Sequence, residues 1–298
     1  MKLGVVVNPY AGKGVDERLV RKVVEKLGEV KLVAQEELGE VYFKEAEVVR
    51  IRRTFTGEDT KEIVKLMDGK VDLIVVFGGD GTASDAASAK PKTPLLCIGT
   101  GTTNVGKLIT PPDFDPERLK VVELDALRVI ETDRLAFNDV VAGNTILATI
   151  NGKVTQIDAE RFMKGEKVRA EPKKFRGKIK AGGKIIEGVF GNVFVNLTSK
   201  EFLGKGSAGG LAMAAFVGFP AVVSSVNEPL VVAEYTKEKL REVEPIVTQT
   251  VSLDYNEKVT IEANTVISAD GNPQTYGKAT VEVLEKAVRV LKEKRKKF

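Results

Sequence analysis

A short segment with the composition of a ligand-binding turn lies near residue 80. It reads Gly78-Gly79-Asp80-Gly81-Thr82, so three of four successive positions are glycine. Glycine lacks a Cβ atom, and positive φ angles and a close approach of ligand to backbone therefore cost little. The carboxylate of Asp80 could accept a proton from a hydroxyl group or orient that group. A helix-capping Asp in an ordinary turn is the simpler alternative.

The run before this segment predicts its place in the fold. Val71 to Phe77 is almost entirely apolar and rich in β-branched residues, which is typical of a strand buried on both faces of a parallel sheet. Open α/β sheets bind ligands at the carboxyl ends of such strands. A second apolar run, Pro94 to Ile98, also ends in a glycine-containing loop, Gly99 to Asn104. Two such loops favour a phosphate site.

A third loop begins at Asn8, directly after the apolar run Lys2 to Val7. It is not a Walker A motif, which requires GxxxxGK[ST], but backbone N–H groups at the start of a helix suit an anion. The candidate nucleotide- and phosphate-binding residues of the three loops are Asn8, Gly12, Gly78, Gly79, Gly81, Thr82, Gly99, Thr100, Gly101 and Asn104.

Phosphoryl transfer is the chemistry that fits these loops, because it requires charge neutralisation and an acceptor hydroxyl held in line. The chain contains no His, so a general base must be a carboxylate, Lys or Tyr. Asp80 is the candidate catalytic residue. It would act either as the base or as the group that orients the hydroxyl through a metal ion, and the sequence leaves both roles open.

The elements that position these loops alternate between strand and helix up to about residue 110, which predicts a doubly wound α/β domain. The expected strands are 2–7, 30–34, 48–52, 71–77 and 94–98, and the expected helices are 15–27, 58–67 and 84–89.

The pattern changes at Pro111-Pro112-Asp113, after which short runs alternate in polarity and end in turn signals. The expected strands are 124–130, 134–141, 145–150, 153–157, 177–181, 184–190, 192–197, 247–253, 258–262 and 266–269. They predict an antiparallel β domain. We expect domains at 1–115 and 116–298, with a C-terminal segment that could pack back on the first. Residues 280–291 fit a helix and a strand equally well.

Composition limits the class of protein. The chain has 298 residues, 43% of them apolar, which is enough for a sizeable core. A net charge of +4 is too small to indicate a nucleic-acid partner. One cysteine, Cys97, excludes an internal disulfide and a cysteine metal cluster. We find no membrane span and no signal-peptide pattern, and we therefore expect a cytoplasmic protein.

The loops resemble those of a known superfamily, the NAD kinases together with the diacylglycerol and sphingosine lipid kinases. Gly78 to Thr82 is identical to the GGDGT motif that these enzymes share. Asn8-Pro9 with Gly12 and Gly14 resembles the NPxxGxG of the lipid-kinase branch. Gly99 to Asn104 is similar to the GTGN loop of the same branch, with one extra Thr.

The second half resembles the NAD kinases instead. Leu135 to Val141 is similar to the segment ending in Asn-Glu/Asp-Val that holds the dinucleotide, and Thr198 to Gly210 resembles a diverged TGSTAY-SAGG segment. Ala269-Asp270-Gly271 resembles the late DG turn, although a simple turn is our preferred interpretation of it. Two segments depart from the pattern: NxGxLGF is replaced by Gly99 to Asn104, and Lys200 to Phe202 replaces the expected glycine-rich stretch.

The resemblance implies an α/β domain followed by a β-sandwich, with the site in the cleft between them. It also implies a kinase that uses ATP, or polyphosphate, with Mg²⁺. Asn138 and Asp139 are the best acceptor-binding candidates, because Asn offers a donor and an acceptor to an amide or base edge and Asp can hold ribose hydroxyls. A β-bulge is the alternative for this pair. The matched segments add Thr198, Ser207 and Gly209 as acceptor-binding candidates.

We therefore expect a kinase that phosphorylates the 2′-hydroxyl of NAD, with NAD and ATP as substrates and a homo-oligomeric assembly. A lipid or small-alcohol kinase of the same superfamily is the first alternative, supported by the Asn8 and Gly99 loops. A nucleotide-binding regulator without turnover is the second, supported by the diverged Thr198 to Gly210 segment, although Asp80 argues against it.

Overall fold

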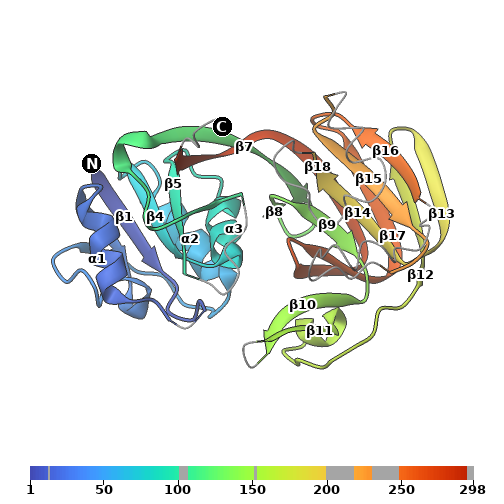
Figure 1. Ribbon diagram of the computed structural model, residues 1–298, viewed down its shortest axis with the longest axis horizontal. Coiled ribbons are helices and arrows are strands. Elements are labelled where there is room, and N and C mark those ends of the chain that lie inside the picture. The colour runs from blue at the N-terminus through green and yellow to red at the C-terminus, as the bar shows by residue number, and fades with distance from the viewer. Residues whose placement is uncertain (13, 101–106, 151–152, 199–217, 230–247, 294–298) are drawn as a thin grey trace. The chain divides into compact units, whose positions relative to one another are not determined.

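The computed structural model divides the chain into two compact units (Figure 1). Unit 1 comprises Met1–Leu124 and Lys286–Phe298, and unit 2 comprises Asp125–Glu285. The division falls later than residue 115, because one continuous strand, β7 (Leu119–Val129), runs through this region. The structure describes residues 1–12, 14–100, 107–150, 153–198, 218–229 and 248–293.

Unit 1 is built on a parallel sheet with the order β5-β4-β1-β2-β3, in which β5 also pairs with β6. The strand bounds are β1 (Lys2–Val7), β2 (Glu29–Ala34), β3 (Glu47–Val49), β4 (Leu73–Gly78), β5 (Leu95–Gly99) and β6 (Ile109–Thr110). The helices are α1 (Glu17–Glu25), α2 (Gly57–Met67) and α3 (Asp80–Ser88), with 3-10 turns at Glu36–Leu38 and Pro116–Arg118. β1 lies between β2 and β4, which is the crossover of a doubly wound α/β fold, as predicted.

Local sequence explains most of these elements. Every residue of β4 is buried, as expected for a strand covered on both faces. The Asp16 side chain caps α1 by accepting from the N–H of Arg18 at 2.9 Å, and Thr56 caps α2 in the same way. Val20 and Val23 of α1 pack into the core of unit 1, so the helix buries the apolar face that its spacing predicts.

The structure corrects the start of the third helix. We expected it at Ser84, but α3 begins at Asp80, inside the glycine segment, and the Ala83 N–H donates to the Gly79 carbonyl at 3.1 Å. The glycines there are not in the left-handed region, since Gly79 has φ −89°. Gly78 is required for space instead, because a Cβ atom would lie 2.5 Å from the Cβ atom of Thr82.

Unit 2 is an antiparallel β structure in which β16-β15-β14-β9-β17-β18 form one path, and β12 pairs with β13 and β17. Its remaining elements are β8 (Arg134–Ala136), β9 (Asp139–Ala142), β10 (Thr145–Ile150), β11 (Lys153–Asp158), α4 (Ala159–Met163), β12 (Phe175–Ala181), β13 (Lys184–Phe190), β14 (Asn192–Leu197), β15 (Ala221–Val226), β16 (Thr248–Leu253), β17 (Lys258–Ala269) and β18 (Asn272–Glu293).

Three features of unit 2 differ from the sequence-based expectation. Sequence analysis missed β15 and α4. The expected strand 134–141 is interrupted at Phe137-Asn138 and forms β8 and β9. The two expected strands 258–262 and 266–269 form one strand, β17, with a register shift between Glu262 and Val266.

Strand β18 settles the ambiguous segment 280–291, which is not a helix. Val281 pairs with Val259 of β17, and Val290 pairs with Leu95 of β5. The buried valines form two pairs, Val281 with Val283 and Val288 with Val290, and the spacing of two within each pair fits a strand.

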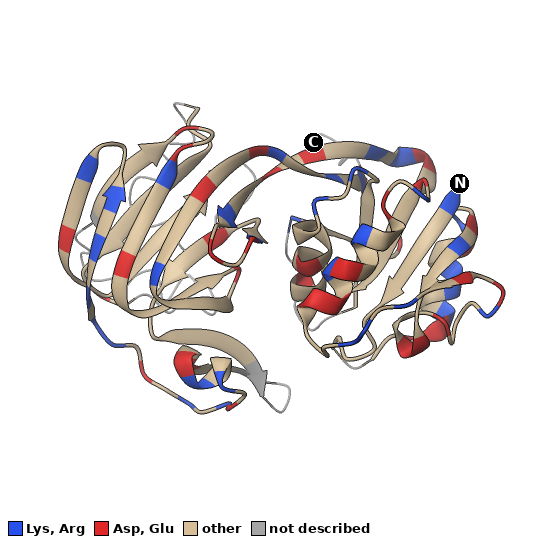
Figure 2. Cartoon of the chain, turned by 180° about the vertical axis from the view of Figure 1, so that it is seen from behind, with Lys and Arg blue, Asp and Glu red and all other residues tan. Residues whose placement is uncertain are grey.

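No helix within the described ranges is long and apolar enough to cross a membrane. Acidic and basic residues are interspersed along the described parts of both units (Figure 2).

Candidate active site

Two of the predicted phosphate loops are joined by a side-chain hydrogen bond in unit 1. The amide Nδ2 of Asn8, after β1, donates to the hydroxyl oxygen of Thr82 in α3 at 2.7 Å. The Oδ1 atom of Asn8 accepts from the N–H of Tyr10 at 3.0 Å, and its own N–H donates to the Phe77 carbonyl at 2.8 Å. Asn8 therefore fixes the turn after β1 against the start of α3. Gly12 has φ +62°, a conformation that favours glycine.

The third loop lies beside the second. Gly99, at the end of β5, pairs with Gly78, and the N–H of Thr100 donates to the Gly78 carbonyl at 2.9 Å. The Thr100 hydroxyl oxygen is buried and has no hydrogen-bond partner. An unsatisfied buried hydroxyl is costly, and a bound phosphate oxygen would satisfy it. Gly101 and Asn104 lie outside the described residues.

Asp80 is the first residue of α3 and follows β4 directly. Its side chain is half-buried, and its position at a helix N-terminus favours the ionised carboxylate. A Cβ atom on Gly81 would meet nothing within 4 Å, so there is open space beside Asp80. The structure thus brings the predicted residues Asn8, Gly78, Thr82 and Thr100 into direct contacts at this edge of the sheet.

In unit 2, one carboxylate holds the predicted acceptor residues. Oδ2 of Asp270 accepts from the N–H of Phe137 at 2.7 Å, and Oδ1 accepts from the N–H groups of Asn138 at 2.9 Å and Asp139 at 3.1 Å. Burial raises the pKa of Asp270, and the three N–H donors oppose that rise. Asp270 therefore fixes the backbone between β8 and β9.

The turn that Asp270 holds presents an unsatisfied polar atom. The Oδ1 atom of Asn138 is buried without a hydrogen-bond partner, while its backbone carbonyl accepts from the N–H of Leu197 at 3.1 Å. Asp139 pairs across the strands with Asn196, whose Oδ1 atom is also buried and without a partner. Two buried amide oxygens near this turn thus lack a donor within the protein.

Thr198 follows β14 and lies next to this turn in the sheet. Its hydroxyl donates to the Phe219 carbonyl, and its N–H donates to the Pro220 carbonyl at 2.8 Å. The Thr198 hydroxyl hydrogen is therefore used within the protein, and only its oxygen lone pairs are left for a ligand. Ser207 and Gly209 lie outside the described residues.

Sequence analysis missed Asp270 as a site residue. We interpreted Asp270-Gly271 as a simple turn, and the structure corrects this because the side chain reaches Phe137 to Asp139, more than 130 positions earlier in the chain. The signal available was an Asp directly after the buried end of β17, a place where an isolated carboxylate needs hydrogen-bond donors.

The residues of unit 1 fit Mg²⁺ only together with a nucleotide. Within the described ranges there is no group of three or more Asp, Glu, His or Cys residues that could hold a metal ion. Mg²⁺ in phosphoryl-transfer sites is commonly held by one or two carboxylates, water and substrate phosphates. Asp80 with the phosphates of a nucleotide matches that donor set.

The chain is similar in sequence and fold to known proteins. Residues 3–120 match the family model described as ATP-NAD kinase N-terminal domain. An uncharacterized protein of Archaeoglobus fulgidus is 54% identical over 297 residues, with 98% of each chain covered. Two structures from Bacillus anthracis str. Sterne, described as diacylglycerol kinases, have TM-scores of 0.57 and 0.53 at 20% and 17% identity. Both cover 97% of this chain and 96% of the other.

The chain shares its two-unit α/β and β fold with these two structures, and its GGDGT segment follows a central parallel strand. Residues 3–120 belong to the ATP-NAD kinase N-terminal domain family. The structural likenesses are below 25% identity and establish the fold, so the acceptor must be argued from the residues.

Proposed function

We propose that this protein is an ATP-dependent kinase that phosphorylates a hydroxyl group, with the 2′-hydroxyl of NAD as its preferred acceptor. The observation that carries the proposal is the turn held by Asp270, in which the Oδ1 atom of Asn138 is buried without a hydrogen-bond partner. The family of residues 3–120 supports the reaction class.

The proposed step is a direct displacement at the γ-phosphorus. The acceptor oxygen forms the new P–O bond, and the β–γ bridging oxygen leaves with its electron pair on ADP. The hydroxyl proton passes to Asp80 if Asp80 is the base, or to an oxygen of the transferred phosphate if Asp80 only orients the hydroxyl. The backbone of the loops at Asn8, Gly78 and Thr100 would hold the phosphates. Mg²⁺, bound by Asp80 and the nucleotide, would supply charge neutralisation.

The acceptor assignment follows from hydrogen-bonding chemistry. Asn138 and Asn196 offer buried amide oxygens, which are acceptors for N–H groups such as those of an adenine or a nicotinamide amide. Asp139 lies beside them and can hold ribose hydroxyls. Burying these oxygens against an acyl chain would leave them unsatisfied, at a cost of about 1–3 kcal/mol each.

A lipid or small-alcohol kinase is the second candidate. The sequences of the Asn8 and Gly99 loops and the fold shared with the Bacillus anthracis structures support it. Polyphosphate is the alternative phosphoryl donor. The proposal also includes a cytoplasmic location and a homo-oligomeric assembly.

A substrate panel tests both candidates. Purified protein with Mg²⁺ would be given ATP or polyphosphate together with NAD, NADH, diacylglycerol or sphingosine, and phosphorylated product would be identified by mass spectrometry. NADP formation from NAD supports the proposal. Phosphorylated lipid without NADP would replace the acceptor, and ATP binding without any product would favour a regulator.

A further inference from the structure

Two exposed aromatic side chains flank the phosphate loops. Phe55 is 76% exposed and Tyr10 is 74% exposed, more than any other large apolar side chain in the described ranges. Tyr10 lies in the turn after β1, and Phe55 lies between β3 and the N-terminus of α2. Both therefore follow strands at the sheet edge where the candidate nucleotide site lies.

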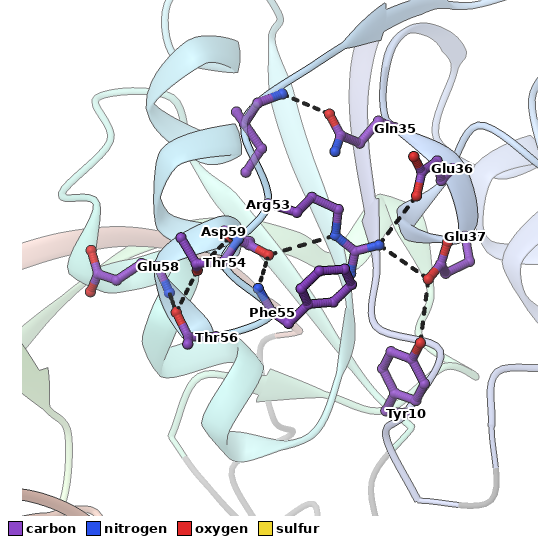
Figure 3. Close-up of polar contacts among 11 residues, drawn as sticks. Tyr10, Gln35, Glu36, Glu37, Arg53, Thr54, Phe55, Thr56, Glu58 and Asp59 are labelled. Atoms are coloured by element: carbon purple, nitrogen blue, oxygen red, sulfur yellow. Dashed lines mark hydrogen bonds and ion pairs between the residues drawn. The ribbon is translucent and has the colours of Figure 1, made fainter.

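Arg53 joins the segments that carry these rings (Figure 3). Its guanidinium carbon is 4.5 Å from the centroid of the Phe55 ring. Its Nη1 atom lies 3.1 Å from Oε1 of Glu37, the oxygen to which the Tyr10 hydroxyl donates at 3.3 Å. The Arg53 side chain is only 9% exposed, so it is a packed support for Phe55 rather than a solvated charge.

Asp59 fixes the backbone of Phe55. Its carboxylate accepts from the N–H of Thr54 at 2.7 Å and from the N–H of Phe55 at 2.9 Å. Burial opposes its ionisation, but these hydrogen bonds and the Arg53 charge together lower the pKa of Asp59. The carboxylate is thus charged at neutral pH and holds the loop in one conformation.

Phe55 adopts a conformation that costs folding stability. Its φ angle is +59°, in the left-handed region where glycine is favoured and aromatic residues are uncommon. The ring is mostly exposed, so it gains little from packing. A strained residue that contributes little to the core indicates a role in function.

The aromatic pair is connected to the phosphate loops by direct contacts. Tyr10 donates its N–H to Asn8, and Asn8 bonds Thr82 in α3. On the Phe55 side, Gly57 begins α2 so close to α3 that a Cβ atom would lie 2.4 Å from a carboxylate oxygen of Asp85. The rings and the phosphate loops therefore belong to one edge of unit 1.

We propose that Phe55 and Tyr10 form the binding surface for the base of the nucleotide donor, with Phe55 as the stacking platform and Arg53 as its support. Aromatic side chains stack on nucleobases whatever the base. This inference rests on the proposed function and makes a nucleoside triphosphate, rather than polyphosphate, the preferred donor. A membrane surface is disfavoured, because the carboxylates of Glu36 and Glu37 pair with Arg53, and Glu37 also contacts Tyr10 (Figure 3); these acidic groups would repel anionic lipid.

Phe55→Gly gives a sharp test, because it removes the ring and relieves the positive φ angle. Calorimetry with Mg²⁺ would measure the affinities for ADP and for tripolyphosphate, which has no base. We expect ADP affinity to fall by about 5- to 100-fold, tripolyphosphate affinity to stay within twofold, and the Tm not to fall. Phe55→Trp should retain ADP affinity. Leu66→Ala, which truncates a partly exposed residue of α2, is the control and should change neither affinity.

Other outcomes overturn the inference. Unchanged ADP affinity in Phe55→Gly, or equal losses for ADP and tripolyphosphate, would exclude a base-binding role while leaving the kinase proposal intact. Binding of phosphatidylglycerol vesicles that Phe55→Gly abolishes, with ADP affinity unchanged, would assign the rings to a membrane. A wild-type protein that binds neither ADP nor tripolyphosphate would refute the proposed function together with this inference.

Discussion

Asp270→Asn tests most directly whether one carboxylate organises the candidate acceptor site. The asparagine oxygen can replace Oδ1 and still accept the N–H groups of Asn138 and Asp139. Its amide nitrogen then replaces Oδ2 and faces the N–H of Phe137, a donor that lies 2.7 Å from Oδ2 in the native protein. In the opposite orientation, the amide nitrogen would replace Oδ1 and face the N–H groups of both Asn138 and Asp139. The orientation with the oxygen at the Oδ1 position is therefore less costly.

The magnitude follows from that single lost contact. A hydrogen bond to a charged group contributes about 1.5–3 kcal/mol, and an unsatisfied buried donor costs about 1–3 kcal/mol. The two energies must not be added, because both describe the loss of the acceptor of the same Phe137 N–H group. Burial raises the pKa of Asp270, so removing the charge returns part of the loss. We therefore expect the free energy of unfolding to fall by about 2 kcal/mol.

Two measurements and a matched control check this value. Urea unfolding followed by circular dichroism gives the change in stability, and hydrogen exchange of peptides covering 137–139 gives the local effect. Asp254→Asn is the same substitution at an exposed turn of unit 2, and we expect it to change stability by less than about 0.5 kcal/mol. Only Asp270→Asn should accelerate exchange at 137–139.

The reasoning is refuted if Asp270→Asn and Asp254→Asn unfold at the same urea concentration and residues 137–139 exchange at the wild-type rate. In that case the three hydrogen bonds would not hold the turn, and Asn138 would need another explanation. A loss of stability without faster local exchange would mean that Asp270 stabilises unit 2 elsewhere.

Five further substitutions test the remaining assignments. Asp80→Asn should lower kcat by about 10²- to 10⁴-fold with little change in ATP affinity, as steady-state kinetics and calorimetry would show, and near-normal turnover would remove Asp80 from the chemistry. Asn138→Ala should raise KM for NAD by a factor corresponding to about 0.5–1.5 kcal/mol and leave KM for ATP unchanged, whereas equal effects on both would contradict an acceptor role. Gly78→Ala should lower the Tm, because its Cβ atom would collide with Thr82. Gly79→Ala, at φ −89°, should weaken nucleotide binding at a nearly constant Tm. A larger loss of Tm in Gly79→Ala than in Gly78→Ala would mean that the two glycines have been assigned the wrong roles. Asp59→Ala removes the acceptor of the Thr54 and Phe55 N–H groups and one of the carboxylates beside Arg53, and it should cost about 1–3 kcal/mol at pH 7. Because the folded-state pKa of Asp59 is lowered, that difference should be complete above about pH 4 and shrink as the pH falls further, and a pH-independent difference in urea unfolding would contradict it.

Local sequence was sufficient for the features that depend on neighbours in the chain. The apolar run ending at Phe77 predicts β4, and Asp16 and Thr56 mark the starts of α1 and α2 by bonding residues two positions away. The local sequence also predicts that Asp80 lies at the end of a buried strand, because an apolar run followed by glycines and a helix indicates a turn at that position. These properties depend on backbone propensity and burial, which a window of a dozen residues contains.

Long-range contacts supplied what such a window lacks. The period of residues 280–291 suited helix and strand alike, and only pairing with β17 and β5 makes them β18. Asp270 differs from an ordinary turn residue only through N–H groups more than 130 positions away. Arg53 supports Phe55 because Glu37 and Asp59, from separate elements, surround it. Hydrogen bonds and strand pairs between distant segments have no signature in local spacing, since the chain's path in three dimensions is what brings their atoms together.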